Sequence, residues 1–286
     1  MNDPAHIYTA EYAVKLQEAL DEPTLWKDIC DVRVSNVRTF TNPYGTDMTV
    51  STSQTRSCPY ALSAVTQTTE SLTISTFDIA PQFIDRADLA QSTFQNQMDI
   101  AKRQGVLLNE AVETAALYEM TVTRGTDFGV EGFTNTAGGT AITVSITNID
   151  DIVRGIKREI REHAGESLAN RNGVFFVWRP ADFEILESVM QANGFVMADT
   201  ALKQGATQGV QYMGATHYSS GFLNANHVAA GVKKCTTIGI LKDTYGQIVI
   251  TQDPELRSGL GIISRVDFGA ETWYNFRAIT FDVNVA

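Results

Sequence analysis

The chain has 286 residues, of which 43% are hydrophobic and 19% are charged, and this composition is typical of a folded protein with a core. Its formal net charge is −11, from 33 acidic and 22 basic residues, which disfavours a protein that binds DNA through its charge because an acidic surface repels phosphate. Three cysteines, Cys30, Cys58 and Cys235, lie far apart without a CxxC pair, so neither a zinc ribbon nor a disulfide framework is indicated.

Neither a secretory signal nor a membrane span is expected. The segment Met1–Pro4 is polar and acidic and lacks the basic and apolar regions of a signal peptide. The strongest apolar run, Val174–Trp178, is far shorter than the roughly 20 residues that a membrane helix needs. We therefore expect a protein that is made and kept in a reducing cytoplasm, or in something assembled there.

A short helix and a long β-hairpin are predicted for the N-terminal part. Tyr8–Glu22 has an amphipathic pattern that ends at Pro23, with Ala13, Leu16 and Leu20 on one side. From Asp31 to Ser75, Ser and Thr dominate, β-branched residues alternate with polar ones, and Asn42-Pro43-Tyr44-Gly45 indicates a turn. This segment has too few large apolar side chains to bury a core of its own, so we expect it to lie against a partner.

A bent strand and a long helix are predicted next. In the strand Leu72–Phe83 the alternation changes phase by one residue: Leu72 and Ile74 share one phase, and Phe77, Ile79 and Phe83 the other, as at a bulge or bend. The helix runs from about residue 88 to residue 120, and its apolar stripe comprises Phe94, Met98, Ala101, Gly105, Leu108, Val112 and Ala115. It would be roughly 50 Å long at 1.5 Å per residue, which suggests a structural strut.

The rest of the chain mixes helices and strands. The predicted strands are Ala141–Ile146, the fully apolar Val174–Trp178, Gly246–Ile250, Gly261–Phe268 and Ile279–Val285. One helix is expected to begin after Asn148, which can cap it, and another to run from Pro180 to Asn193-Gly194.

Two patterns could in principle bind a phosphate or a metal, and a structural role explains each better. Gly129-Val130-Glu131-Gly132 lacks the Lys-Ser/Thr of a phosphate loop and precedes a turn and a strand, so a tight turn is favoured. His217, His227 and Cys235 match no familiar ligand spacing, and a fourth ligand is missing. We therefore expect no metal site and no cofactor.

The charged residues likewise indicate a solvated surface rather than a catalytic centre. Glu159, Glu162 and His163 are interleaved with Lys157, Arg158 and Arg161, as on a helix face with salt bridges. The basic pairs Lys102-Arg103 and Lys233-Lys234 are isolated and form no stripe. No GxSxG or HExxH motif occurs, and no cysteine has a plausible histidine partner, so no catalytic residue is expected.

Three stretches, in their order and spacing, resemble the HK97-fold capsid family. Thr69–Gln91, TESLTISTFDIAPQFIDRADLAQ, is similar to the family's passage from a strand into the spine helix. Phe128–Asn135, FGVEGFTN, resembles the glycine turn after that helix, and Val174–Leu186, VFFVWRPADFEIL, resembles the core strand and helix of the axial domain. The resemblance extends over nearly the whole chain.

The resemblance implies an α+β fold with five parts. These are an N-terminal arm (1–32), an extended β-hairpin loop (33–75), a peripheral domain (76–147) with its spine helix near 88–120, an axial domain (148–261) and C-terminal strands (262–286) that return to the peripheral domain. It implies the major capsid protein of a tailed bacteriophage, which catalyses nothing. Copies would assemble as pentamers and hexamers into an icosahedral shell around double-stranded DNA, without sequence-specific contacts and without a membrane.

The same resemblance bears on partners and cross-links. A separate scaffolding protein is expected, since only about two dozen residues precede the hairpin, together with a portal and decoration proteins, in a virion assembled in the bacterial cytoplasm. Some members of the family join subunits through a lysine in the extended loop, but Asp31–Ser75 contains Arg33, Arg38 and Arg56 and no lysine, so non-covalent contacts are expected. Two alternatives stay open: an encapsulin-type nanocompartment shell, and a small-molecule enzyme with an unrecognised site.

Overall fold

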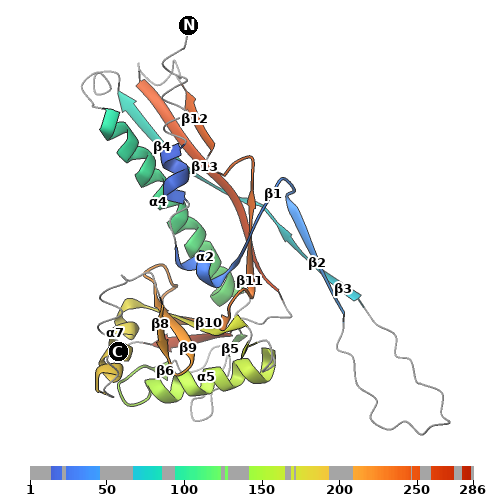
Figure 1. Ribbon diagram of the computed structural model, residues 1–286, viewed down its shortest axis with the longest axis vertical. Helices are drawn as coiled ribbons and strands as arrows, with labels where there is room; N and C mark the ends of the chain where they lie inside the picture. The colour runs from blue at the N-terminus through green and yellow to red at the C-terminus, as the bar shows by residue number, and fades with distance from the viewer. Residues whose placement is uncertain are drawn as a thin grey trace, which may run out of the picture.

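The molecule is elongated, with two layered parts and a projecting hairpin (Figure 1). The computed structural model describes residues 14–20, 24–45, 67–85, 94–123, 126–127, 142–164, 169–170, 172–192, 209–245, 247–251, 259–273 and 279–284. In the upper part, α4 (Phe94–Tyr118) runs along a five-stranded sheet. In the lower part, α5 (Ile149–Ala164) lies against a seven-stranded sheet. The strands β2 (Thr39–Gly45) and β3 (Gln67–Thr73) leave the body at its side.

The remaining elements connect these parts in an order that crosses between them several times. They are a helix over residues 14–20, α2 (Leu25–Ile29), β1 (Asp31–Ser35), β4 (Thr76–Asp85), the π-helix η1 (Glu119–Thr123), β5 (Thr126–Asp127), β6 (Ile142–Thr143), β7 (Val174–Trp178), α7 (Pro180–Ala192), β8 (Val210–Tyr212), β9 (Ala215–Ser219), β10 (His227–Val232), β11 (Thr236–Leu241), β12 (Gln247–Thr251), β13 (Gly259–Thr272) and β14 (Ile279–Asn284).

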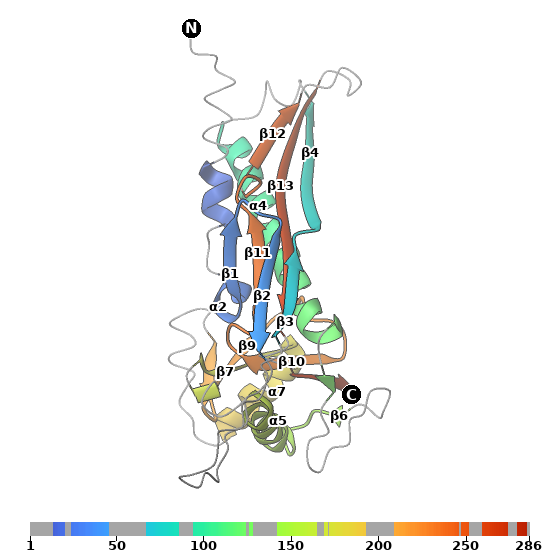
Figure 2. The same ribbon diagram turned by 90° about the vertical axis from the view of Figure 1, so that its right-hand side faces the viewer.

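The long strand β13 organises the five-stranded sheet. On one edge, Gly259 to Phe268 of β13 pair antiparallel with the whole of β4. On the other edge it pairs first with β12 and then, from Phe268 to Thr272, with β11, so these two strands follow one another along the same edge. The strand β1 continues the sheet by pairing parallel with β11. Figure 2 shows the strands of this long, narrow sheet running along the long axis of the molecule.

Buried polar side chains, as well as apolar ones, hold α4 against this sheet. Gln104 accepts a hydrogen bond from the hydroxyl of Ser264 at 2.7 Å, and both residues are buried. Glu113 accepts one at 2.7 Å from Ser220, which follows β9 of the seven-stranded sheet, so a polar contact also joins α4 to the lower part of the molecule. These polar residues share a helix face with Leu108 and Val112, so the buried stripe is wider than an apolar pattern alone reveals.

The seven-stranded sheet has β7 near its centre and buries both of its faces. The strand order is β5-β14-β10-β7-β9-β8, with β6 also paired to β14. Val174, Phe176 and Trp178 point to the core under α5 and α7, while Phe175 and Val177 point to the core shared with α4. Because β7 lies between two cores, every one of its side chains is apolar and buried, as the sequence predicts.

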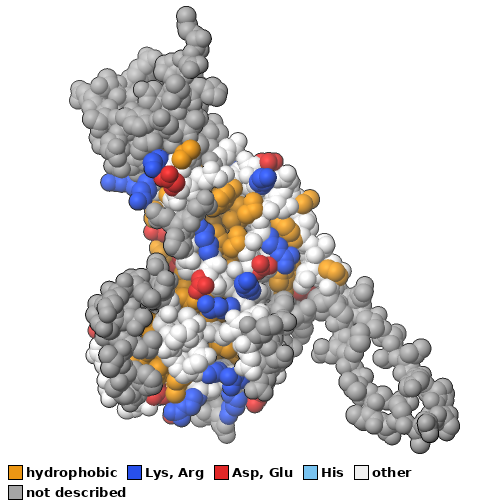
Figure 3. Space-filling view, viewed as in Figure 1, with side chains coloured by type: hydrophobic (Ala, Val, Ile, Leu, Met, Phe, Trp, Pro, Cys, Tyr) orange, Lys and Arg blue, Asp and Glu red, His pale blue; other side chains and the backbone are white. Residues whose placement is uncertain are grey.

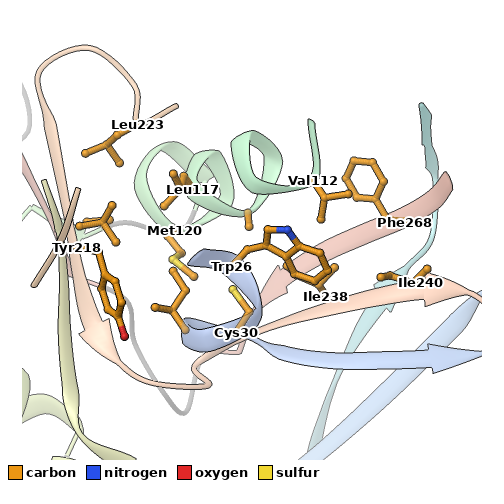
Figure 4. Close-up of a cluster of buried hydrophobic side chains, with 14 of the residues drawn as sticks. Trp26, Cys30, Val112, Leu117, Met120, Tyr218, Leu223, Ile238, Ile240 and Phe268 are labelled. Carbon is orange, nitrogen blue, oxygen red and sulfur yellow. The ribbon is translucent and has the colours of Figure 1, made fainter. Parts of the chain in front are cut away.

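The second of these cores joins the two parts of the molecule (Figure 4). Trp26 and Cys30, on and after α2, lie between α4, with Val112 and Leu117, and the five-stranded sheet. Phe175 and Val177 reach the same cluster from the seven-stranded sheet. The short helix α2, which the sequence patterns did not reveal, therefore fills the junction with the largest aromatic side chain available.

Most of the predicted elements are confirmed. Leu16 and Leu20 are buried on the helix over residues 14–20, and α4, β7, α7 and β14 fall within the predicted segments. The long helix begins, among the described residues, at Phe94 and continues past Tyr118 as the π-helix η1. The Gly129–Gly132 turn and the closing Asn193-Gly194 lie outside the described residues.

Four local expectations need correction. The segment Asn42–Gly45, expected to be a turn, lies within strand β2 and pairs with residues 67–70 of β3. The phase change between Leu72 and Phe83 is a strand break, at which Ile74 donates a hydrogen bond to the carbonyl of Arg38 and the chain passes from β3 to β4 in another sheet. Asn148 precedes α5, but its side chain bonds to Ser145 N–H and Thr143 C=O, in the turn before the helix. Ala115 is only partly buried, because the buried stripe of α4 turns towards Ala116.

The sheets also divide the chain differently from the expected boundary at residue 261. The strands β11 and β12, expected in the axial domain, pair with β13 in the five-stranded sheet. The strand β14, expected to return to the peripheral domain, pairs with β10 of the seven-stranded sheet. The alternation of a strand specifies that one face is buried but not which sheet it joins, so the pattern could not place these strands.

Candidate functional site: a projecting hairpin and its root

The hairpin β2–β3 projects from the body of the molecule (Figure 1). Its strands pair antiparallel from Thr39 with Thr73 to Gly45 with Gln67, and they form a sheet of two strands. Among the described elements neither strand has a second neighbour, so each presents an open edge that another strand can pair with. A hairpin of two strands is marginal alone in water, and this one is therefore suited to stabilisation by a partner.

One face of the hairpin is an exposed polar ladder without charge. Cross-strand pairs place Thr39 opposite Thr73, Thr41 opposite Ser71 and Pro43 opposite Thr69, and all six residues are exposed. Hydroxyl groups both donate and accept hydrogen bonds, so the threonines and Ser71 of this face can be satisfied by a partner when the face is buried on contact. Next to the hairpin, Val34 and Val37 are exposed by 50% and 61%, which adds apolar area beside the ladder.

The other face anchors the hairpin to the body through two glycines. Gly239 of β11 and Gly269 of β13 lie directly opposite each other in the five-stranded sheet. A Cβ atom on Gly239 would lie 2.6 Å from Cδ2 of Leu72, and a Cβ atom on Gly269 would lie 2.6 Å from the carbonyl oxygen of Thr73. The glycine pair thus opens a gap in the side chains of the sheet, through which the hairpin approaches the backbone.

Around this gap, apolar side chains fix the direction of the hairpin. Leu72, Ile74, Leu241 and Trp273 form a small buried cluster, and the partly buried Phe40 packs against it. Trp273 is oriented by a hydrogen bond from its indole N–H to the hydroxyl of Thr237 at 2.6 Å. We call Phe40, Leu72, Ile74, Leu241 and Trp273 the hairpin root.

Of the two histidines and the cysteine that the sequence singled out, His217 and Cys235 are buried, and His227 on β10 is half-buried. His217 is buried on β9, where its Nδ1 accepts a hydrogen bond from the indole of Trp178 at 3.0 Å and its Nε2 lies 3.2 Å from the carbonyl oxygen of Tyr212. With both ring nitrogens bonded within the protein, His217 has no lone pair to offer a metal. Burial lowers the pKa of His217 to about 4 and raises that of the Cys235 thiol to about 11.

Titratable side chains meet where Lys233 lies 3.0 Å from the carboxylate of Asp28 and 2.7 Å from the hydroxyl of Tyr218, an ion pair beside a tyrosine. The described residues hold no group of three or more His, Cys, Asp and Glu side chains that could bind a metal ion. Glu159 and Glu162 lie on α5, where Arg158 approaches Glu159 at 3.5 Å. No helix within the described ranges is long and apolar enough to cross a membrane.

Solved structures of similar architecture exist, although no family model and no curated protein matches the sequence. The capsid of an empty GTA particle is 16% identical with a TM-score of 0.65, covering 93% of this chain and 91% of that chain. The mature capsid of bacteriophage PhiM1 is 11% identical with a TM-score of 0.62, covering 91% and 87%. A virus-like particle from Pyrococcus furiosus is 11% identical with a TM-score of 0.57, covering 96% and 99%.

The chain has the HK97-type capsid fold. The α+β architecture expected from the resemblance is thereby confirmed, and α4 is the long helix that corresponds to the spine helix. The hairpin and its root are the primary candidate site of this chain, because the hairpin projects from the body and both of its strands have an open edge among the described elements. The sequence did not predict that Gly239 and Gly269 lie opposite each other below the root, because the local pattern around a strand glycine does not indicate which residue it pairs with.

Proposed function

We propose that this chain is the major capsid protein of a tailed bacteriophage, a structural subunit that catalyses no reaction. Copies assemble as pentamers and hexamers into an icosahedral shell that encloses double-stranded DNA. The observation that carries the proposal is coverage: the similarity to capsids of bacteriophage PhiM1 and of GTA particles takes in about nine tenths of this chain and of those chains. Almost no part of the chain lies outside this match, where it could carry an additional activity.

The physical chemistry of the surface supports this function. The exposed hydroxyl ladder and open edges of β2 and β3 need a neighbour to be buried, and a second copy supplies one at every position of a shell. The net charge of −11 limits adhesion of the packaged polyanion to its container. In this proposal residues 1–32 act as an arm and residues 33–75 as the extended loop, the five-stranded sheet with α4 forms the peripheral domain, and the seven-stranded sheet with α5 and α7 forms the axial domain.

The remaining parts of the proposal concern partners and cross-links. A scaffolding protein, a portal and decoration proteins act on the assembling shell, and the mature protein resides in the virion. Loop lysines do not join the subunits, because residues 31–75 contain none and a guanidinium keeps its proton at any usable pH. Contacts such as hairpin burial therefore hold the shell.

The test is to purify the chain and image it by electron microscopy across a range of concentrations. Closed shells or rings of five and six copies are expected. A strictly monomeric protein in light scattering and an absence of particles, also after co-expression with neighbouring phage genes, would contradict the proposal.

A nanocompartment shell is a second candidate, favoured by the similarity to a virus-like particle from Pyrococcus furiosus, which covers nearly all of both chains. The contents of particles isolated from the natural source separate the two functions. Nuclease-protected double-stranded DNA of uniform length supports the phage capsid. A single enzyme packaged in many copies supports the nanocompartment instead.

A further inference from the structure

The two parts of the molecule meet at a joint that the chain crosses by a short segment. The strand β10 belongs to the seven-stranded sheet and β11 to the five-stranded sheet, and only Lys233–Cys235 lie between them. Lys234 has a φ of 68°, a left-handed conformation that is costly for a residue other than glycine. Its N–H donates to the carbonyl of Ile29, the last residue of α2, at 2.6 Å. The crossing therefore ties the lower sheet to α2 at one point, and the orientation of the two parts depends on further contacts.

The apolar cluster at this joint does not by itself fix the orientation. It contains Trp26 and Leu117 from the upper part and Phe175 and Val177 from the lower part. Apolar contacts are non-directional, and packed surfaces can slide on one another by small amounts. Hydrogen bonds depend on distance and angle, so polar contacts across the joint determine the orientation more strictly.

The helix α4 changes its geometry where it reaches the joint. After Tyr118 it continues as the π-helix η1, which contacts β13 of the upper sheet and β10 and β14 of the lower sheet. Such π-helical turns are rare and occur mostly at functional sites. The hydroxyl of Thr121 donates to the carbonyl of Leu117 at 2.7 Å, a bond that often accompanies bending of a helix. The long helix thus does not pass through the joint as one regular α-helix.

Polar side chains of β9 and of the residue after it reach across the joint. Ser220 donates to Glu113 of α4 at 2.7 Å, and both residues are buried. Tyr218 packs its ring in the apolar cluster and donates to Asp28 of α2 from its hydroxyl, which lies at the edge of the cluster in Figure 4. Lys233 lies 2.7 Å from this hydroxyl and 3.0 Å from the carboxylate of Asp28. We call Asp28, Tyr218 and Lys233 the rim cluster.

The rim cluster is accessible to solvent, whereas the contact between Glu113 and Ser220 is enclosed. The side chain of Asp28 is 55% exposed, and Figure 3 shows acidic and basic side chains next to one another where the two parts meet. Burial by itself would raise the pKa of Asp28, but hydrogen bonds from Tyr218 and Lys233 and the charge of Lys233 lower it, so the carboxylate is ionised at neutral pH. An exposed ion pair opens at small cost, because water and salt replace its partners. The rim cluster can therefore open while the buried contact stays closed.

We infer that the rim cluster is a latch that sets the orientation of the lower part relative to the upper part. When it is closed, Asp28 holds α2 against Tyr218 and Lys233 in one geometry. When it is open, the two parts shift along the apolar cluster and stay joined at Glu113 and Ser220. Identical subunits close a shell only at a defined angle between neighbours, so the latch determines the diameter of the shell. The inference rests on the proposed assembly into a shell and names the residues that set its curvature.

Two matched tyrosine variants test the latch in the free chain. Tyr218→Phe keeps the ring in the apolar cluster and removes only the hydroxyl of the rim cluster. Tyr212→Phe is the control, because Tyr212 is equally buried and donates to Asp150 at 2.8 Å within the lower part. The amide of Lys234, which bonds across the joint, should exchange its hydrogen roughly tenfold faster in Tyr218→Phe and at nearly the wild-type rate in Tyr212→Phe.

The diameter of the particles tests the role of the latch in assembly, with circular dichroism to verify that each variant folds. Electron micrographs should show one diameter for wild-type particles and a spread of diameters for Tyr218→Phe and Asp28→Asn. The controls Tyr212→Phe and Asp151→Asn, which lose contacts within the lower part, should keep the wild-type diameter. Exchange of the ion pair, Asp28→Lys with Lys233→Asp, should restore a single diameter, whereas either reversal alone should not.

The inference is overturned if Tyr218→Phe and Asp28→Asn form particles of the wild-type diameter, or if the amide of Lys234 exchanges at the wild-type rate in Tyr218→Phe. An equal spread of diameters in Tyr212→Phe would also overturn it, since the loss of any tyrosine hydrogen bond would then suffice. Each of these results leaves the proposed capsid function intact. Failure of the wild-type chain to form particles would instead remove the proposed function, and the exchange of Lys234 would still decide whether the rim cluster holds the joint.

Discussion

His217 illustrates how a residue with catalytic potential becomes structural through its surroundings. It stacks on Phe176 with ring centroids 4.8 Å apart and accepts the indole hydrogen bond of Trp178, so the neutral imidazole fits the core and a proton on Nδ1 would remove that bond. Burial lowers its pKa to about 4 in the folded chain, against an unfolded value near 6.5.

The pH dependence of stability follows with a definite sign. Between pH 6.5 and about 4 the unfolded chain binds a proton at this position and the folded chain does not, so stability falls as the pH falls through this window. The loss is on the order of 3 kcal/mol at most. His217→Gln, which cannot titrate, should flatten this part of the profile. Urea unfolding of the wild-type protein and of His217→Gln at pH 7 and pH 4.5 measures how much free energy of unfolding each protein loses between the two pH values. Equal losses in the two proteins would contradict the assignment.

At the scale of single positions in the sheet, Gly269 is expected to tolerate no side chain. Its added Cβ would meet backbone, the carbonyl oxygen of Thr73 at 2.6 Å and Cα of Ile74 at 3.2 Å, and backbone cannot rotate away. Gly269→Ala should therefore cost about 1–3 kcal/mol and displace the hairpin root. Denaturant unfolding and the fluorescence of Trp273, in the root, report the two effects.

Gly231→Ala is the matched control for Gly269→Ala. Gly231 is also a buried strand residue, but its added Cβ would lie 3.4 Å from the ring of Phe175, an ordinary contact. This variant should unfold at nearly the wild-type denaturant concentration. Equal losses in the two variants would mean that strand glycines as such, and not the approach of the hairpin, determine the cost.

At the scale of elements, the helix over residues 14–20 is held by α4 rather than by its own propensity. Within the described residues 14–20, the carbonyl groups of Ala19 and Leu20 accept hydrogen bonds from side chains outside the helix. Asn109 donates to the carbonyl of Ala19 at 2.8 Å, and the hydroxyl of Tyr245 donates to that of Leu20 at 3.2 Å. The approach is possible because Gly105 faces Ala19.

A substitution at this crossing should release the short helix. Gly105→Ala favours α4 by up to about 1 kcal/mol through helix propensity, yet its Cβ would lie 2.6 Å from that of Ala19. We expect a net loss of stability and faster amide exchange in residues 14–20. Adding Ala19→Gly should recover part of the loss by removing the colliding methyl group. If the double variant is no more stable than Gly105→Ala alone, another contact limits the crossing.

At the scale of the whole molecule, the proposed shell is held by non-covalent contacts alone. Because residues 31–75 contain no lysine, mature particles boiled in denaturant should release one species near 31.3 kDa. Denaturing gel electrophoresis and mass spectrometry measure this directly. A ladder of covalent oligomers would show that a side chain elsewhere in the chain supplies the missing amine.

The sequence by itself determined the elements whose signal is local. The 3.6-residue period located α4, the unbroken apolar run located β7, and the Ser/Thr-rich alternation between residues 31 and 75 identified a hairpin that lacks a core. The fold class was implied by the resemblance of three stretches, in their order and spacing, to the HK97-fold capsid family. Each of the local inferences needs only neighbours within a turn or a strand, and such neighbours are visible along the chain.

Only the tertiary structure decided what these elements contact. It paired β14 with β10, aligned β11 and β12 along one edge of β13, and set Gly239 opposite Gly269 beneath the hairpin. Pairing depends on the fit between residues far apart in the chain, and a strand or a glycine has the same local pattern whichever partner it meets.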